Sequence, residues 1–222
     1  MKKIGLLIAM EKEMELFTES LQNMLPRKIH KCNFYSGNIG DKQITAVVSG
    51  MGNVNAALCT SDLINLFGVD MIINIGVSGG LDATLNIGDF IVGDDIVYHD
   101  LWCGEPYIYG QVAGCPLFFH SAPQLAALLP DLRHGLLCCG DMFITKAEEL
   151  ANIKKQFPDG LAVDMESAAI AQTCYLYDKP LLSVRQISDT PGVEHQIEQY
   201  ESFWQNAPQN SVKILSEILE KL

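Results

Sequence analysis

The sequence predicts a single α/β domain, a three-layer sandwich in which a mixed, mainly parallel sheet is flanked by helices. Apolar runs of strand length alternate with helical patterns, which is typical of this class. The runs are apolar throughout, as in sheets covered on both faces. The chain has 222 residues and is 48% hydrophobic, which suffices for one sizeable core. Because no repeat or linker interrupts the pattern, we assign residues 1–222 to one domain.

The predicted elements follow in order along the chain. Buried strands are expected at residues 4–9, 43–50, 70–76, 88–99, 134–140 and 180–188, with a shorter apolar run, LAV, before Asp164. Helices are expected at residues 11–21, 55–67, 167–177 and 210–222, of which the last has the clearest spacing of apolar residues by threes and fours. Residues 100–122 are rich in aromatic residues, glycine and proline, and we expect either a covered loop or a surface that another subunit covers.

The charge balance excludes two classes of partner. The formal net charge is -12, whereas nucleic acids and anionic membranes are bound by basic patches. No apolar run approaches the roughly 18–20 residues of a membrane span. The opening MKKIGLLIAM is followed by no cleavage site, so we expect no signal peptide.

The cysteines and histidines indicate neither a disulfide framework nor a metal site. The seven cysteines include no C-x-x-C pair, which favours reduced thiols and a cytoplasmic location. The five histidines are dispersed along the chain. We therefore expect no metal and no cofactor.

Polar residues and glycines follow the predicted strands at their carboxyl ends, where open α/β sheets bind ligands. These positions are Glu13, 50–53, 76–80, Asp164, Glu166, Ser188 and Asp189. Taken singly, each has a structural explanation: Glu13 suits the first turn of a helix, and Asp189 suits a turn. Taken together, they predict a ligand site at one edge of the sheet.

Three charged residues in buried segments need partners. Asp164 and Glu166 flank Met165 in the apolar stretch AVDMESAA, and ionised carboxylates are costly to bury alone. Arg185 lies in a predicted buried strand, and Asp189 or Glu13 are candidate partners for it. The chain has only three arginines, and neither glycine-rich turn carries a basic residue, so a phosphate site is disfavoured. The pattern predicts a neutral, polyhydroxylated ligand handled by carboxylates.

Eight segments carry a resemblance to a known family. They are IGLLIAMEKEMELF, VVSGMGNVNAA, INIGVSGGL, IGDFIVGDDIVYHD, YGQVAGCP, GDMFIT, AVDMESAAIAQTC and RQISD. In this order, over residues 1–189, they resemble the 5'-methylthioadenosine/S-adenosylhomocysteine nucleosidases of the purine nucleoside phosphorylase superfamily. The resemblance implies the nucleoside phosphorylase/hydrolase-like fold, a homodimer, and hydrolysis of the N-glycosidic bond between adenine and a 5'-thio-substituted ribose.

The resemblance also implies a role for each matching residue. As catalytic residues, Glu13 would activate water, and Asp189 would assist the departure of adenine at N7. Glu166 would hold the ribose hydroxyls, and Arg185 would orient Glu13. The remaining substrate-binding positions are Met165 against the sugar, Phe143 and Ile144 at the base, Met10 and Val77 as walls, and Ser188 beside Asp189.

The sequence departs from the family at Val77, where a small polar residue is common, and in the stretches 101–106 and 190–204. These departures leave the preferred 5'-substituent and the role of Asp164 open. Two alternative functions also stay open: a phosphate-dependent purine nucleoside phosphorylase of the same fold, and a catalytically silent nucleoside-binding protein.

Overall fold

The structure is a computed structural model that describes residues 2–8, 11–204 and 207–222, without the side chains of residues 12, 13, 16, 207 and 208. The strands are β1 (Lys3–Ile8), β2 (Gln22–Ile29), β3 (Cys32–Ile39), β4 (Lys42–Val48), β5 (Met71–Gly80), β6 (Phe90–Tyr98), β7 (Phe119–His120), β8 (Arg133–Cys139), β9 (Gly160–Asp164) and β10 (Leu181–Asp189). The helices are α1 (Glu11–Thr18), α2 (Asn53–Phe67), α3 (Pro123–Ala126), α4 (Ala147–Gln156), α5 (Ser167–Leu176), α6 (Gln196–Phe203) and α7 (Ala207–Lys221).

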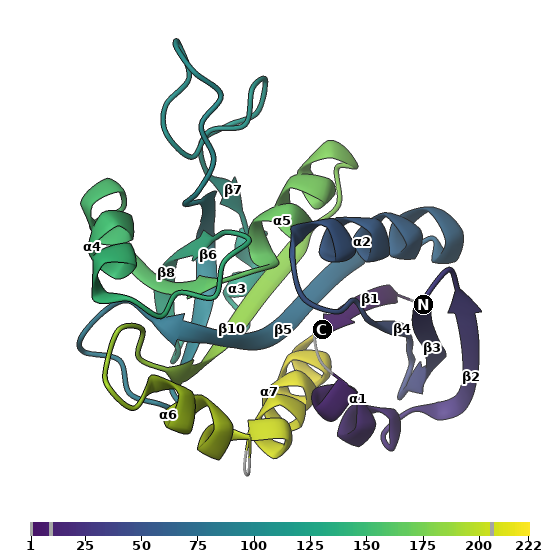
Figure 1. The fold of residues 1–222 in the computed structure, drawn as a ribbon. Helices are drawn as coiled ribbons and strands as arrows, with labels where there is room; N and C mark the ends of the chain where they lie inside the picture. Colours follow the sequence, from purple (N-terminus) through teal and green to yellow (C-terminus); the bar gives the residue numbers. More distant parts are fainter. Residues whose placement is uncertain (1, 9–10, 205–206) are drawn as a thin grey trace.

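The strands form one mixed sheet with helices on both faces, which confirms the predicted fold class (Figure 1). Strand β1 pairs in parallel with β4 and β5, and β5 pairs in parallel with β10. On its other side β10 pairs with β6, β6 pairs with β8, and β8 pairs with β9. Strand β9 in turn pairs with the end of β5. The sheet thus closes on itself at one end, and the carboxyl ends of β5, β9 and β10 come together there.

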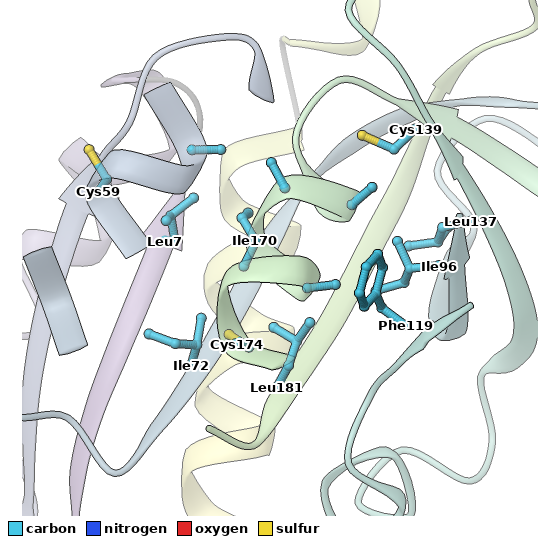
Figure 2. Packing of buried hydrophobic residues seen from close by; sticks show 14 of the residues in the cluster. Leu7, Cys59, Ile72, Ile96, Phe119, Leu137, Cys139, Ile170, Cys174 and Leu181 are labelled. Carbon is cyan, nitrogen blue, oxygen red and sulfur yellow. The ribbon is translucent and has the colours of Figure 1, made fainter. Parts of the chain in front are cut away.

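Neighbouring residues of the central strands face opposite layers. Leu7 of β1 and Ile72 of β5 pack with Ile170 and Cys174 of α5 (Figure 2), in the cluster that α2 also covers. The adjacent residues Leu6 and Ile73 belong to the cluster under α1 and α7. Because both faces of these strands are buried, their sequences show continuous apolar runs instead of alternation.

The β2–β3 hairpin and three short helices are absent from the sequence prediction. Strand β2 is exposed along almost its whole length and contains Pro26, so no apolar pattern marks it. Among the described strands it pairs only with β3, at the edge of the sheet, where proline is tolerated. The helices α3, α4 and α6 were not predicted either. Helix α3 has only 4 residues, and α4 buries only Ile153, so neither shows a periodic apolar pattern.

The segment between β6 and β7 is irregular, as predicted, and projects from the rest of the molecule (Figure 1). Trp102 and Ile108 in this segment are exposed. Within the described part of the chain, no helix combines the length and the apolar character that crossing a bilayer requires.

Candidate active site

A cavity of about 730 Å³, open mouth included, lies at the carboxyl ends of β5, β9 and β10. Its wall is formed by Met51, Asn74, 75–79, 142–144, 163–166, Arg185, Ser188, Asp189, Pro191 and Tyr200. Eight of the ten predicted site residues are among them: Val77, Phe143, Ile144, Met165, Glu166, Arg185, Ser188 and Asp189. Met10 and the side chain of Glu13 lie outside the described residues, so their places in the site stay predictions.

Arg185 is paired with Asp164, and not with Asp189 as one of the predictions had it. Its Nε donates to Asp164 Oδ2 at 2.7 Å, and both side chains are 1% exposed. The guanidinium also donates to Asn74 Oδ1 at 2.5 Å. Asp189 lies beyond reach of this pairing because its carboxylate faces Ser188 and Gln196.

Asp164 also fixes the start of α5. Its Oδ1 accepts hydrogen bonds from Ser167 N at 3.1 Å and from Ser167 Oγ at 2.8 Å. Both oxygens of this carboxylate are therefore used within the protein. The role that the sequence left open for Asp164 is structural: it neutralises Arg185 and holds the β9–α5 junction.

Glu166 is the carboxylate of this pair that can serve a ligand. It lies on the cavity wall between β9 and α5, and its Oε1 accepts a hydrogen bond from Gly52 N at 2.8 Å. Gly52 has a φ of 94°, a conformation that glycine adopts at little cost. Burial, reinforced by the nearby charge of Asp164, raises the pKa of Glu166 to about 7. A buried carboxylate facing a cavity is suited to accept hydrogen bonds from hydroxyl groups.

Asp189 is directed into the cavity by an irregularity in β10. The pairing of β10 with β5 shifts between Ile187 and Asp189, so Ser188 is the extra residue of a β-bulge. The Ser188 hydroxyl donates to Asp189 Oδ1 at 2.6 Å, and Gln196 Nε2 donates to Oδ2 at 2.7 Å. Burial raises the pKa of Asp189, although these two hydrogen bonds oppose the rise. A carboxyl group with a raised pKa is suited to donate a proton to a leaving group.

The turn after β10 packs closely on β5. A Cβ atom at Gly79 would lie 2.7 Å from Pro191 Cγ, so only glycine permits this approach. The contact holds the segment that leads to α6 against the rim of the cavity.

The opposite wall carries Phe143 and Ile144. The ring of Phe143 contacts that of Tyr200 edge to face, with 5.7 Å between centroids. The carbonyl oxygen of Ile144 accepts a hydrogen bond from Gln196 Nε2 at 2.7 Å. Sequence reasoning missed Gln196 and Tyr200 because both lie in the polar stretch 190–204, which matches no motif.

The charges of the cavity are those of carboxylates and of one neutralised cation. Asp164, Glu166 and Asp189 line it, whereas the single basic residue among its described lining residues is the paired Arg185. The other two arginines lie elsewhere: Arg133 pairs with Asp82, and Arg27 lies over the ring of Phe67. Over the described ranges, no group of three or more His, Cys, Asp or Glu side chains is placed to hold a metal ion.

Comparison with known proteins gives consistent results. Residues 3–220 match the model of the Phosphorylase superfamily. A 5'-methylthioadenosine/S-adenosylhomocysteine nucleosidase from Staphylococcus aureus is 36% identical, over 99% of this chain and 100% of the relative. Two solved structures superpose with a TM-score of 0.95 at 34% identity and cover 100% of this chain.

Both solved structures contain a bound ligand. One is the S-adenosylhomocysteine nucleosidase of Streptococcus pyogenes in complex with 5-methylthiotubericidin, of which 97% is covered. The other is the 5'-methylthioadenosine/S-adenosylhomocysteine nucleosidase of Neisseria meningitidis in complex with methylthio-immucillin-A, of which 100% is covered. The full-length match in sequence and in fold confirms the resemblance: this chain belongs to the 5'-methylthioadenosine/S-adenosylhomocysteine nucleosidase family of the phosphorylase superfamily.

Proposed function

We propose that the protein hydrolyses the N-glycosidic bond of 5'-methylthioadenosine, S-adenosylhomocysteine or both, and releases adenine and the 5'-thio-substituted ribose. The observation that carries this proposal is the chemistry of the cavity wall. Two carboxylates face a cavity of ligand size: Glu166, which has no ion-pair partner among the described side chains, and Asp189, which lies beside polar hydrogen-bond donors. The relatives that the chain resembles are nucleosidases for these substrates.

The same wall favours water over phosphate as the second substrate. A phosphorylase binds a dianion and usually supplies arginine or lysine for it. Among the described residues that line this cavity, the basic one is Arg185, and Asp164 already neutralises it. Hydrolysis therefore fits this site better than phosphorolysis.

Departure of adenine leaves an oxocarbenium-like sugar. The reaction therefore needs an acid that protonates the departing adenine and a proton acceptor that activates the water. Asp189 assists the departure of adenine at N7, since burial raises its pKa and so makes protonation of its carboxyl group easier. Glu166 accepts hydrogen bonds from the ribose hydroxyls. Glu13, which lies in the first turn of α1, deprotonates the attacking water. These are the assignments that the resemblance implies for this chain.

Arg185 supports this arrangement indirectly. Although it is paired with Asp164, its positive charge still acts on Glu166: it lowers the pKa of this carboxyl group and so opposes the rise that burial causes. We retain the proposal that it helps to orient Glu13.

We further propose that the protein is a cytoplasmic homodimer. Helices α2 and α5 lie side by side on one face of the sheet (Figure 1) and expose large apolar side chains there. Val54, Leu58, Tyr175 and Leu176 are each at least half exposed, and Trp102 of the projecting segment is exposed as well. A dimer would bury this surface. The seven cysteines are all free, which agrees with a reducing compartment.

The dimer is tested by the molar mass in solution. The wild-type protein is expected at twice the chain mass of 24.5 kDa, and Leu58→Glu is expected to shift it toward the monomer. A wild-type protein that stays monomeric at micromolar concentration would contradict this part of the proposal.

The reaction is tested by following adenine release from 5'-methylthioadenosine in phosphate-free buffer. We expect release without phosphate, and Asp189→Asn as the control should lose most of it. Release only after phosphate is added would identify a phosphorylase. Tight binding of the substrate without release would identify a nucleoside-binding protein.

A further inference from the structure

Gln196, the first residue of α6, donates hydrogen bonds to two acceptors on the cavity wall, one on Ile144 and one on Asp189. Its side chain is buried, with 3% of the residue exposed. Its Nε2 donates to the carbonyl oxygen of Ile144 and to Asp189 Oδ2, each at 2.7 Å. Its Oε1 accepts a hydrogen bond from Gly192 N at 2.9 Å. Each N–H of the amide is thus committed to a group that the proposed function assigns to the base.

The amino group of a 6-aminopurine has the same hydrogen-bonding character as this amide nitrogen. Both are planar nitrogens with two N–H donors. Both need two acceptors when they are removed from water, because an unsatisfied buried donor is costly. A carbonyl oxygen and a carboxylate oxygen held together by one nitrogen form a matching pair of acceptors.

We propose that Gln196 is an internal substitute for the amino group of the base, which bonds the two acceptors of the base in the ligand-free protein and releases them when a 6-aminopurine binds. This inference rests on the proposed function, since it takes Ile144 and Asp189 as the groups that bind the base. It adds a residue that no part of the proposed reaction requires and that sets the affinity for the base.

The position of Gln196 allows the exchange. It is the first residue of α6, so its side chain is attached at the end of the helix and not within it. His195, the residue before the helix, makes no side-chain capping hydrogen bond that would fix this turn. On leaving, the amide exchanges its protein acceptors for water, and the base supplies the two N–H donors that the acceptors lose.

Displacement of Gln196 reduces the affinity of every base that carries a group at this position. Removing the amide should therefore strengthen binding, whereas removing a merely structural residue would weaken it. Two hydrogen bonds of modest net strength are exchanged, so we expect adenine to bind about tenfold more tightly to Gln196→Ala, about 1.4 kcal/mol. Unsubstituted purine has only hydrogen in place of the amino group, so it should gain less.

The experiment measures the dissociation constants of adenine and of unsubstituted purine by titration calorimetry. The variants are Gln196→Ala and Gln196→Met, of which the second keeps the length of the side chain but has no N–H. The matched control is Gln199→Ala: Gln199 lies one turn further along α6 and accepts a hydrogen bond from Thr190 N at 3.0 Å, and its amide bonds neither Ile144 nor Asp189. Thermal unfolding of each variant establishes that it is folded.

We expect both Gln196 variants to tighten adenine about tenfold, to tighten purine less, and Gln199→Ala to change neither ligand by more than about twofold. Unchanged or weaker adenine binding in folded Gln196 variants would overturn the inference, and so would equal tightening of purine. If the wild-type protein releases adenine from 5'-methylthioadenosine but the variants bind adenine no better, the inference alone fails. If the wild-type protein neither releases nor binds adenine, the proposed function fails.

Discussion

Glu166→Gln should make the protein more stable at neutral and alkaline pH while it weakens substrate binding. Burial raises the pKa of Glu166 from 4.5 to about 7, so the folded protein is penalised for holding this carboxylate ionised. Each unit of difference between the pKa values of the folded and unfolded states corresponds to 1.36 kcal/mol. Above pH 7 the raised pKa therefore lowers the free energy of unfolding by about 3 kcal/mol. Glutamine keeps an acceptor for Gly52 N and carries no charge.

The sign of the pH dependence follows from the raised pKa. Below pH 4.5 the carboxyl group is protonated in both states and costs nothing. Between pH 4.5 and about 7 the unfolded state is ionised while the folded state still holds the proton, so the wild-type protein loses stability relative to the variant across this window, and the loss is complete above it. Since the new amide needs partners of its own, we expect a net gain of about 2 kcal/mol at pH 8, which is roughly 4–8 °C in Tm for a chain of this size.

The assay is thermal unfolding at pH 8 and at pH 4.5 or below. The control is Glu201→Gln, which makes the same change at an exposed residue. The difference in Tm between Glu166→Gln and wild type should be positive at pH 8 and should fall to zero or below at the acidic pH, where only the cost of the new amide remains, whereas Glu201→Gln should change little at either. In parallel, KM for 5'-methylthioadenosine should rise because the ribose hydroxyls lose a charged acceptor. A variant that is no more stable than wild type at pH 8, or a difference independent of pH, would refute this reasoning.

Three further predictions concern the other charged groups of the site. Asp189→Asn and Glu13→Gln should each lower kcat by about 10²-fold or more, the usual scale for general acid–base groups; steady-state rates of adenine release measure this, and near-normal turnover in either would remove that residue from its role. Asp164→Asn leaves Arg185 buried without its counter-charge and should cost about 3–5 kcal/mol of unfolding free energy in urea, whereas Asp82→Asn, which breaks the exposed pair with Arg133, should cost about 1 kcal/mol or less; equal costs would contradict the buried pairing. The kcat/KM of the wild type should fall as the pH drops below about 7, because Glu166 is then protonated, and a profile that stays flat down to pH 5.5 would show that binding does not need the ionised form.

The sequence predicted the elements that bury apolar side chains in a regular pattern, on both faces of the central strands and on one face of helices such as α7. The apolar runs that became β1, β5 and β10 are marked by burial alone, so their boundaries are close to the observed ones. Strand β2 has no buried face, and its pairing with β3 is held by backbone hydrogen bonds that leave no trace in the sequence.

The residues of the candidate site were likewise predicted only in part. The sequence predicted that Glu166, Met165 and Asp189 lie at one edge of the sheet, because each follows the carboxyl end of a strand. In the structure these three residues line one cavity at that edge. The need of Arg185 for a buried anion was predicted, but its choice of Asp164 over Asp189 depends on the bulge at Ser188, which turns Asp189 away. Gln196 could not be predicted, since only the folded turn places its amide against Ile144 and Asp189.

The most direct test of hydrolysis against phosphorolysis identifies the sugar product. The wild-type protein is incubated with 5'-methylthioadenosine in buffer that contains phosphate, and the products are analysed by mass spectrometry. Because the basic residue on the described wall of the cavity is neutralised by Asp164, we expect free 5-methylthioribose even when phosphate is abundant. Formation of 5-methylthioribose 1-phosphate would contradict this expectation.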